Sequence, residues 1–188
     1  MDSVEGFIKR YLRAPNVVWS APGRANLIGE HTDYNDGLVR PVAIAERTVA
    51  AAGRGDPDGD VVAVTSAGYP DVARHYLRDV GRGTIPGWAA YPLGVAWALQ
   101  PHAKRPGPVS ALLSIASDIP AGGGLSSSAA LEIAIGSALD DLWDLGLSSA
   151  ELARAAAVAA RGAGARPHRH GGAALARGRR VRGPARGM

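Results

Sequence analysis

A run of glycines and serines at positions 122–130 constrains the fold of this chain more than any other feature. It reads Gly-Gly-Gly-Leu-Ser-Ser-Ser-Ala-Ala. Residues 109–117 before it have the apolar spacing of a half-buried strand, and the apolar residues after it predict a helix from about Ala129 to Leu145. A strand, a glycine-rich loop and a helix start, in this order, can form a cradle for phosphate groups. Glycines let backbone N–H groups face an anion, and the helix dipole favours negative charge there.

The spacing of this loop excludes two common nucleotide-binding motifs and leaves one structural alternative open. The loop is not a Walker A motif, because no Gly-Lys-Ser/Thr follows, and Ser127 breaks the G-x-G-x-x-G spacing of a dinucleotide fingerprint. A flexible connector is the alternative to a phosphate cradle. We expect the serines to cap the N–H groups at the helix start, and a hydroxyl there can ligate a Mg²⁺ ion carried by a nucleotide.

A second segment, Ala21–Pro41, concentrates side chains that suit a polyhydroxylated ligand. Glu30, His31 and Asp33 fall within four positions. Carboxylates accept hydrogen bonds from sugar hydroxyls, and imidazole can donate or accept. Arg24 can hold a phosphate or neutralise charge during phosphoryl transfer. A polar hairpin turn between two strands is the alternative interpretation of the same residues.

Together the two segments resemble a known family. Gly23–Tyr34, which reads GRANLIGEHTDY, resembles the signature of galactokinases. Pro120–Glu132, which reads PAGGGLSSSAALE, is similar to the ATP-binding motif of the wider GHMP kinase superfamily. The residues from Trp88 to Tyr91 resemble the stretch that lies between these motifs in that family. The resemblance implies an α+β fold, the GHMP-kinase N-terminal domain of the ribosomal protein S5 domain 2-like type, with a mixed sheet and helices on one face.

The resemblance also implies roles for individual residues. Arg24 would be the arginine that stabilises the transition state. The galactose ligands would be Glu30, His31, Thr32 and Asp33. The residues that hold ATP would be Gly122, Gly123, Gly124, Leu125, Ser126, Ser127 and Ser128, and Ser128 would also ligate Mg²⁺. Trp88 would flank the adenine, with a place in the core as its alternative. Glu132 is expected to be a solvated helix residue.

The implied activity is ATP- and Mg²⁺-dependent phosphorylation of D-galactose at its 1-hydroxyl, the galactokinase step of the Leloir pathway. Two alternatives stay open: a related kinase for N-acetylgalactosamine or arabinose, and a non-catalytic sensor of galactose or ATP. Galactose and ATP are therefore the expected partners, and we expect neither a nucleic acid nor a membrane. The family implies a monomer, although the sequence does not determine the oligomeric state. The chain has no cysteine, signal segment or long apolar run, as is typical of a cytoplasmic protein.

The composition changes after Ala160. Residues 161–188 hold 8 of the 21 Lys and Arg and none of the 17 Asp and Glu, so residues 1–160 carry 13 − 17 = −4. The basic balance therefore belongs to the tail and does not predict nucleic-acid binding by the rest of the chain. The tail has too little apolar bulk to offset the entropy lost on ordering, and we expect it to be disordered.

These observations divide the chain into an incomplete GHMP kinase domain, residues 1–160, and a basic tail, residues 161–188. The family would supply a Mg²⁺-binding glutamate near residue 160, a catalytic-base aspartate after it and a second domain, and the sequence contains none of these. Our hypothesis is that the tail is an out-of-frame translation of a GC-rich gene, so that the chain is a truncated, inactive form. A genuine basic tail is the alternative.

Overall fold

The computed structural model describes residues 2–29, 38–57, 59–81, 84–104, 109–120, 125–162 and 179–181. In chain order, the helices and strands are α1 (Ser3–Tyr11), β1 (Val17–Ile28), β2 (Arg40–Arg54), β3 (Val61–Ser66), β4 (Tyr69–Tyr76), α2 (Ala90–Leu99), β5 (Ala111–Ser117), α3 (Ser127–Trp143), α4 (Ser149–Gly162) and β6 (Arg179–Arg180). Short 3-10 helices are η1 (Leu77–Asp79), η2 (Gly87–Ala89) and η3 (Gln100–His102).

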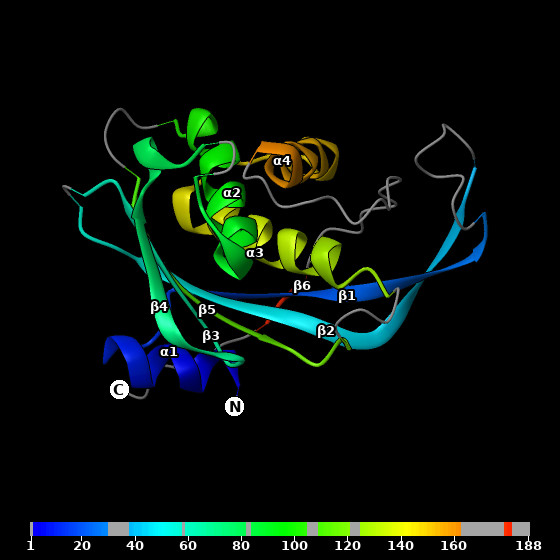
Figure 1. Ribbon diagram of the computed structural model, residues 1–188, viewed down its shortest axis with the longest axis horizontal. Helices are drawn as coiled ribbons and strands as arrows, with labels where there is room; N and C mark the ends of the chain where they lie inside the picture. Colours follow the sequence, from blue (N-terminus) through cyan, green and yellow to red (C-terminus); the bar gives the residue numbers. More distant parts are fainter. Residues whose placement is uncertain are drawn as a thin grey trace.

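The strands in the described part of the chain form one mixed sheet in the order β4-β3-β5-β2-β1-β6 (Figure 1). Neighbouring strands are antiparallel except β3 and β5, which are parallel. The longest pair is β1 with β2, from Val17 opposite Ala52 to Ile28 opposite Arg40. The far end of this pair projects beyond the other strands as an arm (Figure 1). The expected α+β class with a mixed sheet is confirmed.

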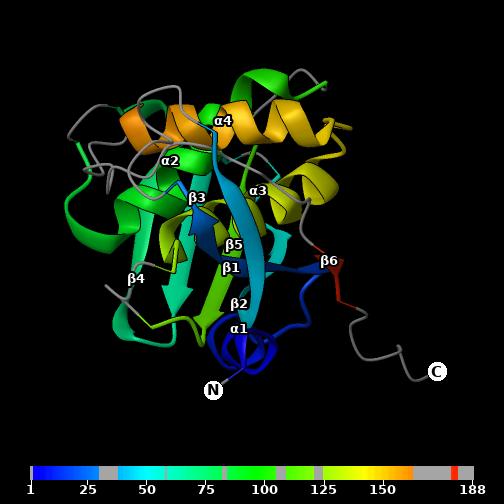
Figure 2. The same cartoon turned by 90° about the vertical axis from the view of Figure 1, so that its right-hand side faces the viewer.

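Helices cover both faces of this sheet. α2, α3 and α4 lie on one face, as expected, and α3 packs directly on β1 and β2 (Figure 1). α1 lies on the opposite face, which the expectation of helices on one face did not include (Figures 1 and 2). Its Phe7 packs there with Val18 and Ala51 in a small second core. The hydroxyl of Tyr11 lies 3.2 Å from the carbonyl oxygen of Ala63 and 3.1 Å from that of Leu113.

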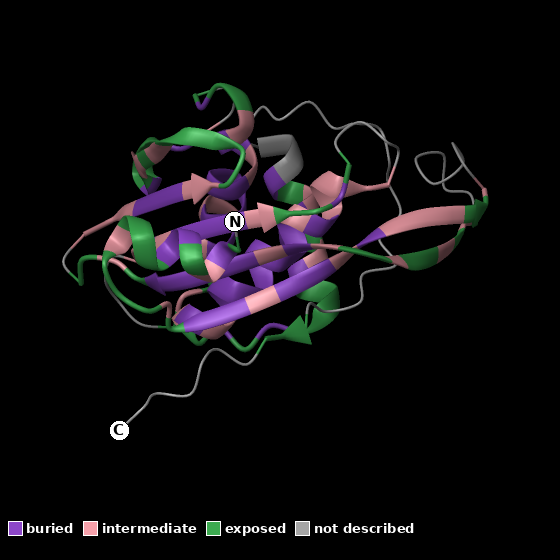
Figure 3. Ribbon diagram, turned by 90° about the horizontal axis from the view of Figure 1, so that it is seen from below, coloured by how far each residue is buried: buried purple, intermediate pink, exposed green. Residues whose placement is uncertain are grey.

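The two cores follow from side-chain alternation along β1. Val17 and Ala21 belong to the large core under α2, α3 and α4, whereas Val18 belongs to the small core under α1. Successive side chains of a strand point to opposite faces of the sheet, so a strand covered on both sides is apolar at nearly every position. Figure 3 shows this as buried residues along the central strands.

Several predicted elements agree with the structure to within a few residues. The sequence predicts a strand over 61–66 and a helix that begins near Ala89 and ends before Pro101, and β3 and α2 occupy these positions. Helix α3 begins two residues earlier than expected, at Ser127. The sequence predicts a short strand over 17–19, whereas β1 continues to Ile28, and β4 was not predicted. The sequence also predicts a helix over 148–158 with Ser149 as its cap. The cap of α4 is instead Ser148, because its hydroxyl accepts a hydrogen bond from the Glu151 N–H at 3.3 Å.

The tail contains an ordered element that the sequence analysis did not predict. Arg161 and Gly162 complete α4, and Arg179–Arg180 form β6 at the edge of the sheet. The remaining tail residues lie outside the described residues, so their predicted disorder stays a prediction. Among the described residues, every helix is too short or too polar to span a lipid bilayer.

Candidate active site

A cavity of about 230 Å³ lies between the strand pair β1–β2 and the start of α3. Gly23 and Arg24 line it from β1, Pro41 lines it from β2, and Ser126 and Ala129 line it from the α3 side. The arginine of the first motif and a serine of the second motif are therefore neighbours around one cavity, although they lie far apart in the sequence.

A backbone hydrogen bond joins the two motifs directly. The N–H of Arg24 donates to the carbonyl oxygen of Leu125 at 3.0 Å. The approach requires glycine at position 23, since a Cβ there would lie 2.8 Å from Ile44 Cδ1 and 3.0 Å from the Leu125 oxygen. The register of β1 against β2 also shifts between Pro22 and Arg24, which frees this part of β1 from regular pairing.

Ser126 turns the chain into α3. Its φ of 52° and ψ of 43° are left-handed, and its side chain makes no capping hydrogen bond. The expectation that this serine caps the helix is therefore wrong. Short side chains tolerate the left-handed region better than branched ones. The left-handed conformation of Ser126 places the first turn of α3 at the cavity. A helix N-terminus at a cavity wall favours a bound anion.

Several predicted site residues cannot be placed. The predicted galactose ligands Glu30, His31, Thr32 and Asp33 lie outside the described residues, and so do Gly122, Gly123 and Gly124 of the loop. Of the predicted ATP-binding residues, the structure describes Leu125, Ser126, Ser127, Ser128 and Trp88. Ser127 and Ser128 are the first two residues of α3.

Trp88 lies in η2, immediately before α2. Its ring stacks on Tyr69, with ring centroids 4.7 Å apart and planes inclined by 13°. It also packs against the large core, and it is not among the residues that line the 230 Å³ cavity. These contacts favour the core alternative, and contact with an adenine stays a prediction.

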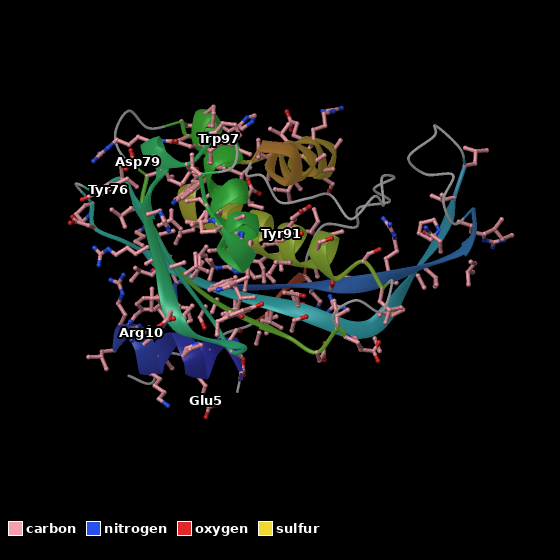
Figure 4. All side chains as sticks on the ribbon, viewed as in Figure 1. Glu5, Arg10, Tyr76, Asp79, Tyr91 and Trp97 are labelled. Carbon is pink, nitrogen blue, oxygen red and sulfur yellow. The ribbon has the colours of Figure 1, made fainter. Side chains whose placement is uncertain are left out.

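Glu132 differs from its expected position on a solvated face. The residue is 9% exposed and lies on the part of α3 that packs between the sheet and the other helices. Burial raises its pKa to about 8. Burial also raises the pKa of Tyr91 on α2, and the nearby Glu132 raises it further (Figure 4). At neutral pH the Glu132 carboxyl is therefore mainly protonated and can donate a hydrogen bond.

Asn26 is a candidate that the sequence analysis passed over. It lies on β1, two positions beyond Arg24, and its Oδ1 atom is buried without a hydrogen-bond partner. Buried acceptors of this kind are rare in folded proteins and often await a water or a ligand. The signal was its place inside the first motif, between an arginine and a glutamate.

The described residues offer few ligands for a metal ion. No group of three His, Asp or Glu side chains among them is placed to hold one. The Ser128 hydroxyl lies in the first turn of α3, beside the loop expected to hold phosphates. Mg²⁺ usually reaches a kinase bound to phosphate oxygens and takes one or two protein ligands. A single hydroxyl of this kind fits an ion that arrives with a nucleotide.

Two family models match the chain. Residues 5–54 match the galactokinase galactose-binding signature, and residues 90–176 match the N-terminal domain of the GHMP kinases. The cavity lies where these two matches meet, because Arg24 belongs to the first and Ser126 to the second. The second match continues past Ala160, so the predicted domain boundary at residue 160 stays a prediction.

Known proteins of the same two groups are similar to the chain. A galactokinase from Streptomyces coelicolor is 46% identical over 151 residues, which are 80% of this chain and 38% of that protein. The crystal structure of Lactococcus lactis galactokinase complexed with galactose superimposes with a TM-score of 0.74 at 32% identity, over 86% of this chain and 42% of that one. Methanococcus jannaschii mevalonate kinase shares the fold, with a TM-score of 0.64 at 18% identity, over 76% and 45% of the two chains. The chain thus spans less than half the length of these relatives.

Proposed function

Because the chain belongs to the galactokinases of the GHMP kinase superfamily, we propose that it is the N-terminal part of a kinase that transfers the γ-phosphoryl group of ATP to the 1-hydroxyl of D-galactose. The observation that carries this proposal is the cavity shared by Arg24 and Ser126. A phosphoryl transferase needs a cation and an anion cradle at one site, and Arg24 and Ser126, the candidates for these two roles, line one cavity from opposite sides.

On the phosphate side, the proposed cradle is the loop Gly122–Ser128 together with the first turn of α3. The backbone of Ser126 and the helix dipole favour negative charge at the cavity. Arg24 would offset the charge that develops on the transferred group, and its place is fixed by the hydrogen bond from its own N–H to Leu125. Mg²⁺, when bound with ATP beside Ser128, would supply charge neutralisation between the phosphates.

On the sugar side, we propose that Glu30, His31, Thr32 and Asp33 bind the hydroxyls of galactose. They follow directly on β1, whose residue Arg24 lines the cavity wall. The unsatisfied Oδ1 of Asn26 could accept one further hydrogen bond, from a sugar hydroxyl or from an ordered water. Carboxylate, imidazole and amide groups together form the set of donors and acceptors that a polyhydroxylated ligand requires.

We expect the chain by itself to bind these ligands better than it turns them over. The sequence has no counterpart of the family's catalytic aspartate, and loss of a general base lowers rates by about 10²–10⁴-fold. The hypothesis of an out-of-frame tail accounts for this absence. Nucleotide sequencing around codon 160 tests it, because an intact galactokinase frame should be present there in another reading frame.

Binding measurements distinguish the proposed function from its alternatives. Calorimetric titration of the chain with galactose, N-acetylgalactosamine, arabinose and a non-hydrolysable ATP analogue should show galactose as the preferred sugar. Preference for another sugar favours the related kinases. Tight binding of galactose or ATP, without turnover even when the rest of a galactokinase is supplied, favours the sensor. A folded chain that binds no sugar and no nucleotide contradicts all three.

The contribution of Arg24 can be tested separately. Arg24→Ala should lower the affinity for the ATP analogue, because it removes from the cavity the guanidinium that is proposed to interact with the phosphates. Arg54→Ala is the matched control, since Arg54 ends β2 on an exposed position and does not line the cavity. Equal affinities of the two variants would contradict the role of Arg24. Galactose and ATP are the partners we propose, and the cytoplasm stays the predicted compartment.

A further inference from the structure

The outer edge of β1 holds a segment that the proposed kinase chemistry does not use. β6 pairs antiparallel with β1, with Arg180 opposite Trp19 and Arg179 opposite Ser20. The N–H of Val181 donates to the carbonyl oxygen of Val18 at 2.8 Å. Figure 2 shows this short strand in red beside β1. It belongs to the basic tail, whose composition alone favours disorder.

Asp141 of α3 connects the three elements that meet at this edge. Its Oδ2 atom accepts a hydrogen bond from Trp19 Nε1 at 2.9 Å and lies 3.3 Å from Arg180 Nε. The indole of the sheet therefore holds the carboxylate that pairs with the incoming arginine. The Asp141 side chain is 26% exposed, so it is held by the protein and still open to solvent on one side. A carboxylate fixed in this way loses less side-chain entropy when a cation binds.

The two arginines of β6 face different environments. Directly opposite residues of an antiparallel pair project from the same face of the sheet. Trp19 packs against the large core on the α3 side, and Arg180 lies on that side with it, next to Asp141. Ser20 projects to the other side, where its hydroxyl accepts from Arg47 Nε at 3.1 Å. Arg179 therefore lies on the same face of the sheet as the cation Arg47, whereas Arg180 lies on the same face as the anion Asp141.

We propose that the β1 edge at Val18–Ser20, together with Asp141, is a docking site for an extended segment with arginine opposite Trp19, and that its occupant is this chain's own Arg179–Val181. Exposed edge strands can pair with other chains through their unpaired N–H and C=O groups. A segment docked in this way occupies part of that edge and prevents its pairing with a second copy. This role belongs to a genuine basic tail, the alternative to an out-of-frame one, and it does not depend on the proposed kinase activity.

Hydrogen exchange of the full chain tests this docking. The Val181 amide should be protected, because it donates to Val18. In Arg180→Ala and in Asp141→Asn, exchange of this amide should be about two- to five-fold faster, as expected for loss of a half-exposed ion pair. The asparagine in Asp141→Asn keeps an oxygen for the Trp19 indole, so it removes the charge alone. Arg179→Ala is the matched control and should leave the exchange rate unchanged.

Three results would overturn the proposal. The first is exchange of the Val181 amide in the full chain at the rate of an unstructured peptide. The second is an equal effect of Arg179→Ala and Arg180→Ala, which would contradict the assigned faces. The third is protection that increases with protein concentration, which would make a second copy the occupant. Unchanged exchange of the amides between β2 and β5 in every variant shows that the sheet itself stays folded.

Discussion

The N–H of Arg24 donates a 3.0 Å hydrogen bond to the carbonyl oxygen of Leu125. This bond fixes a strand that leads to the proposed sugar ligands against the loop that leads into the proposed phosphate cradle. The distance between the two half-sites is thereby set by backbone atoms and not by a contact between side chains. Phosphoryl transfer depends on such positioning more than on covalent chemistry by the protein.

Gly23→Ala should disrupt this contact. The added Cβ would lie 2.8 Å from Ile44 Cδ1 and 3.0 Å from the Leu125 oxygen, so the strand and the loop must separate. We expect a destabilisation of about 1–3 kcal/mol, typical of overpacking, and weaker binding of the ATP analogue. Urea denaturation and calorimetry measure the two effects. Gly68→Ala is the control, because a Cβ at Gly68 meets nothing within 4 Å.

Ser126→Gly should stabilise the chain. Ser126 has a φ of 52°, and glycine relieves the strain of a left-handed residue, which is worth about 1–2 kcal/mol before the extra freedom of the unfolded chain is subtracted. Ser126→Val should destabilise the chain, since a branched side chain tolerates this conformation poorly. The thermal midpoint should therefore be highest for Ser126→Gly, intermediate for the unchanged chain and lowest for Ser126→Val. A valine variant as stable as the serine chain would contradict the assigned conformation.

Glu132→Gln should change how stability depends on pH. The folded-state pKa of Glu132 is about 8, above its ordinary value of 4.5. Below pH 4.5 the carboxyl is protonated in both states, and as pH rises toward 8 the unfolded chain ionises first, so stability is lost. Relative to Glu132→Gln, the loss should be on the order of a few kcal/mol, at about 1.4 kcal/mol per pKa unit.

A second carboxylate gives an internal comparison for that experiment. Hydrogen bonds from Ser148 lower the pKa of Glu151. Its contribution to stability is present above its ordinary pKa and is lost as pH falls through the lowered one, which is the opposite direction. Chemical denaturation from pH 9 to well below pH 4 should therefore show opposite trends for Glu132→Gln and Glu151→Gln. Parallel trends would show that Glu132 is solvated.

Substitutions on the arm of β1 and β2 should improve solubility without loss of stability. Ile28 and Leu38, at its far end, are 69% and 95% exposed, and Leu27 is exposed as well. Contiguous exposed apolar side chains favour association. Leu27→Ser with Ile28→Ser should reduce light scattering on concentration and leave the thermal midpoint unchanged. Ile133→Ser, at a buried position, should instead unfold the chain or lower its midpoint.

The sequence predicted the fold where short-range patterns dominate. The helix after the glycine loop has clear periodicity, so its position followed from spacing. Strand β3 is a short run of mainly β-branched residues without alternation, and this composition indicated a strand. Strand β4 was not predicted because its residues are exposed or half-buried and its sequence has no strong alternation of apolar and polar residues. The extension of β1 to Ile28 passes through a proline and a glycine, which normally indicate a turn, and here a shift in register accommodates them.

The sequence identified single residues of the candidate site, but not their arrangement around a cavity or their burial. Arg24 and Ser126 were named from motifs, and their common cavity depends on strand pairing that no local pattern encodes. Glu132 was assigned to solvent because glutamates usually are, although it is three residues before Ile135 and seven before Leu139, on the apolar face of α3. The helical spacing therefore indicated that Glu132 is buried, but the prediction followed the usual exposure of glutamate instead. β6 could not be foreseen, because its partner Asp141 is distant in sequence.

The hydroxyl of Tyr11 contacts carbonyl oxygens of Ala63 and Leu113, on the two parallel strands of the sheet. Helix α1 leaves the ribosome before the strands that receive it, and its docking surface is incomplete until Leu113 has been synthesised. Loop closure between such distant residues is slow compared with helix formation. During synthesis, Phe7 and Tyr11 therefore remain accessible to chaperones until the segment that contains Leu113 has emerged.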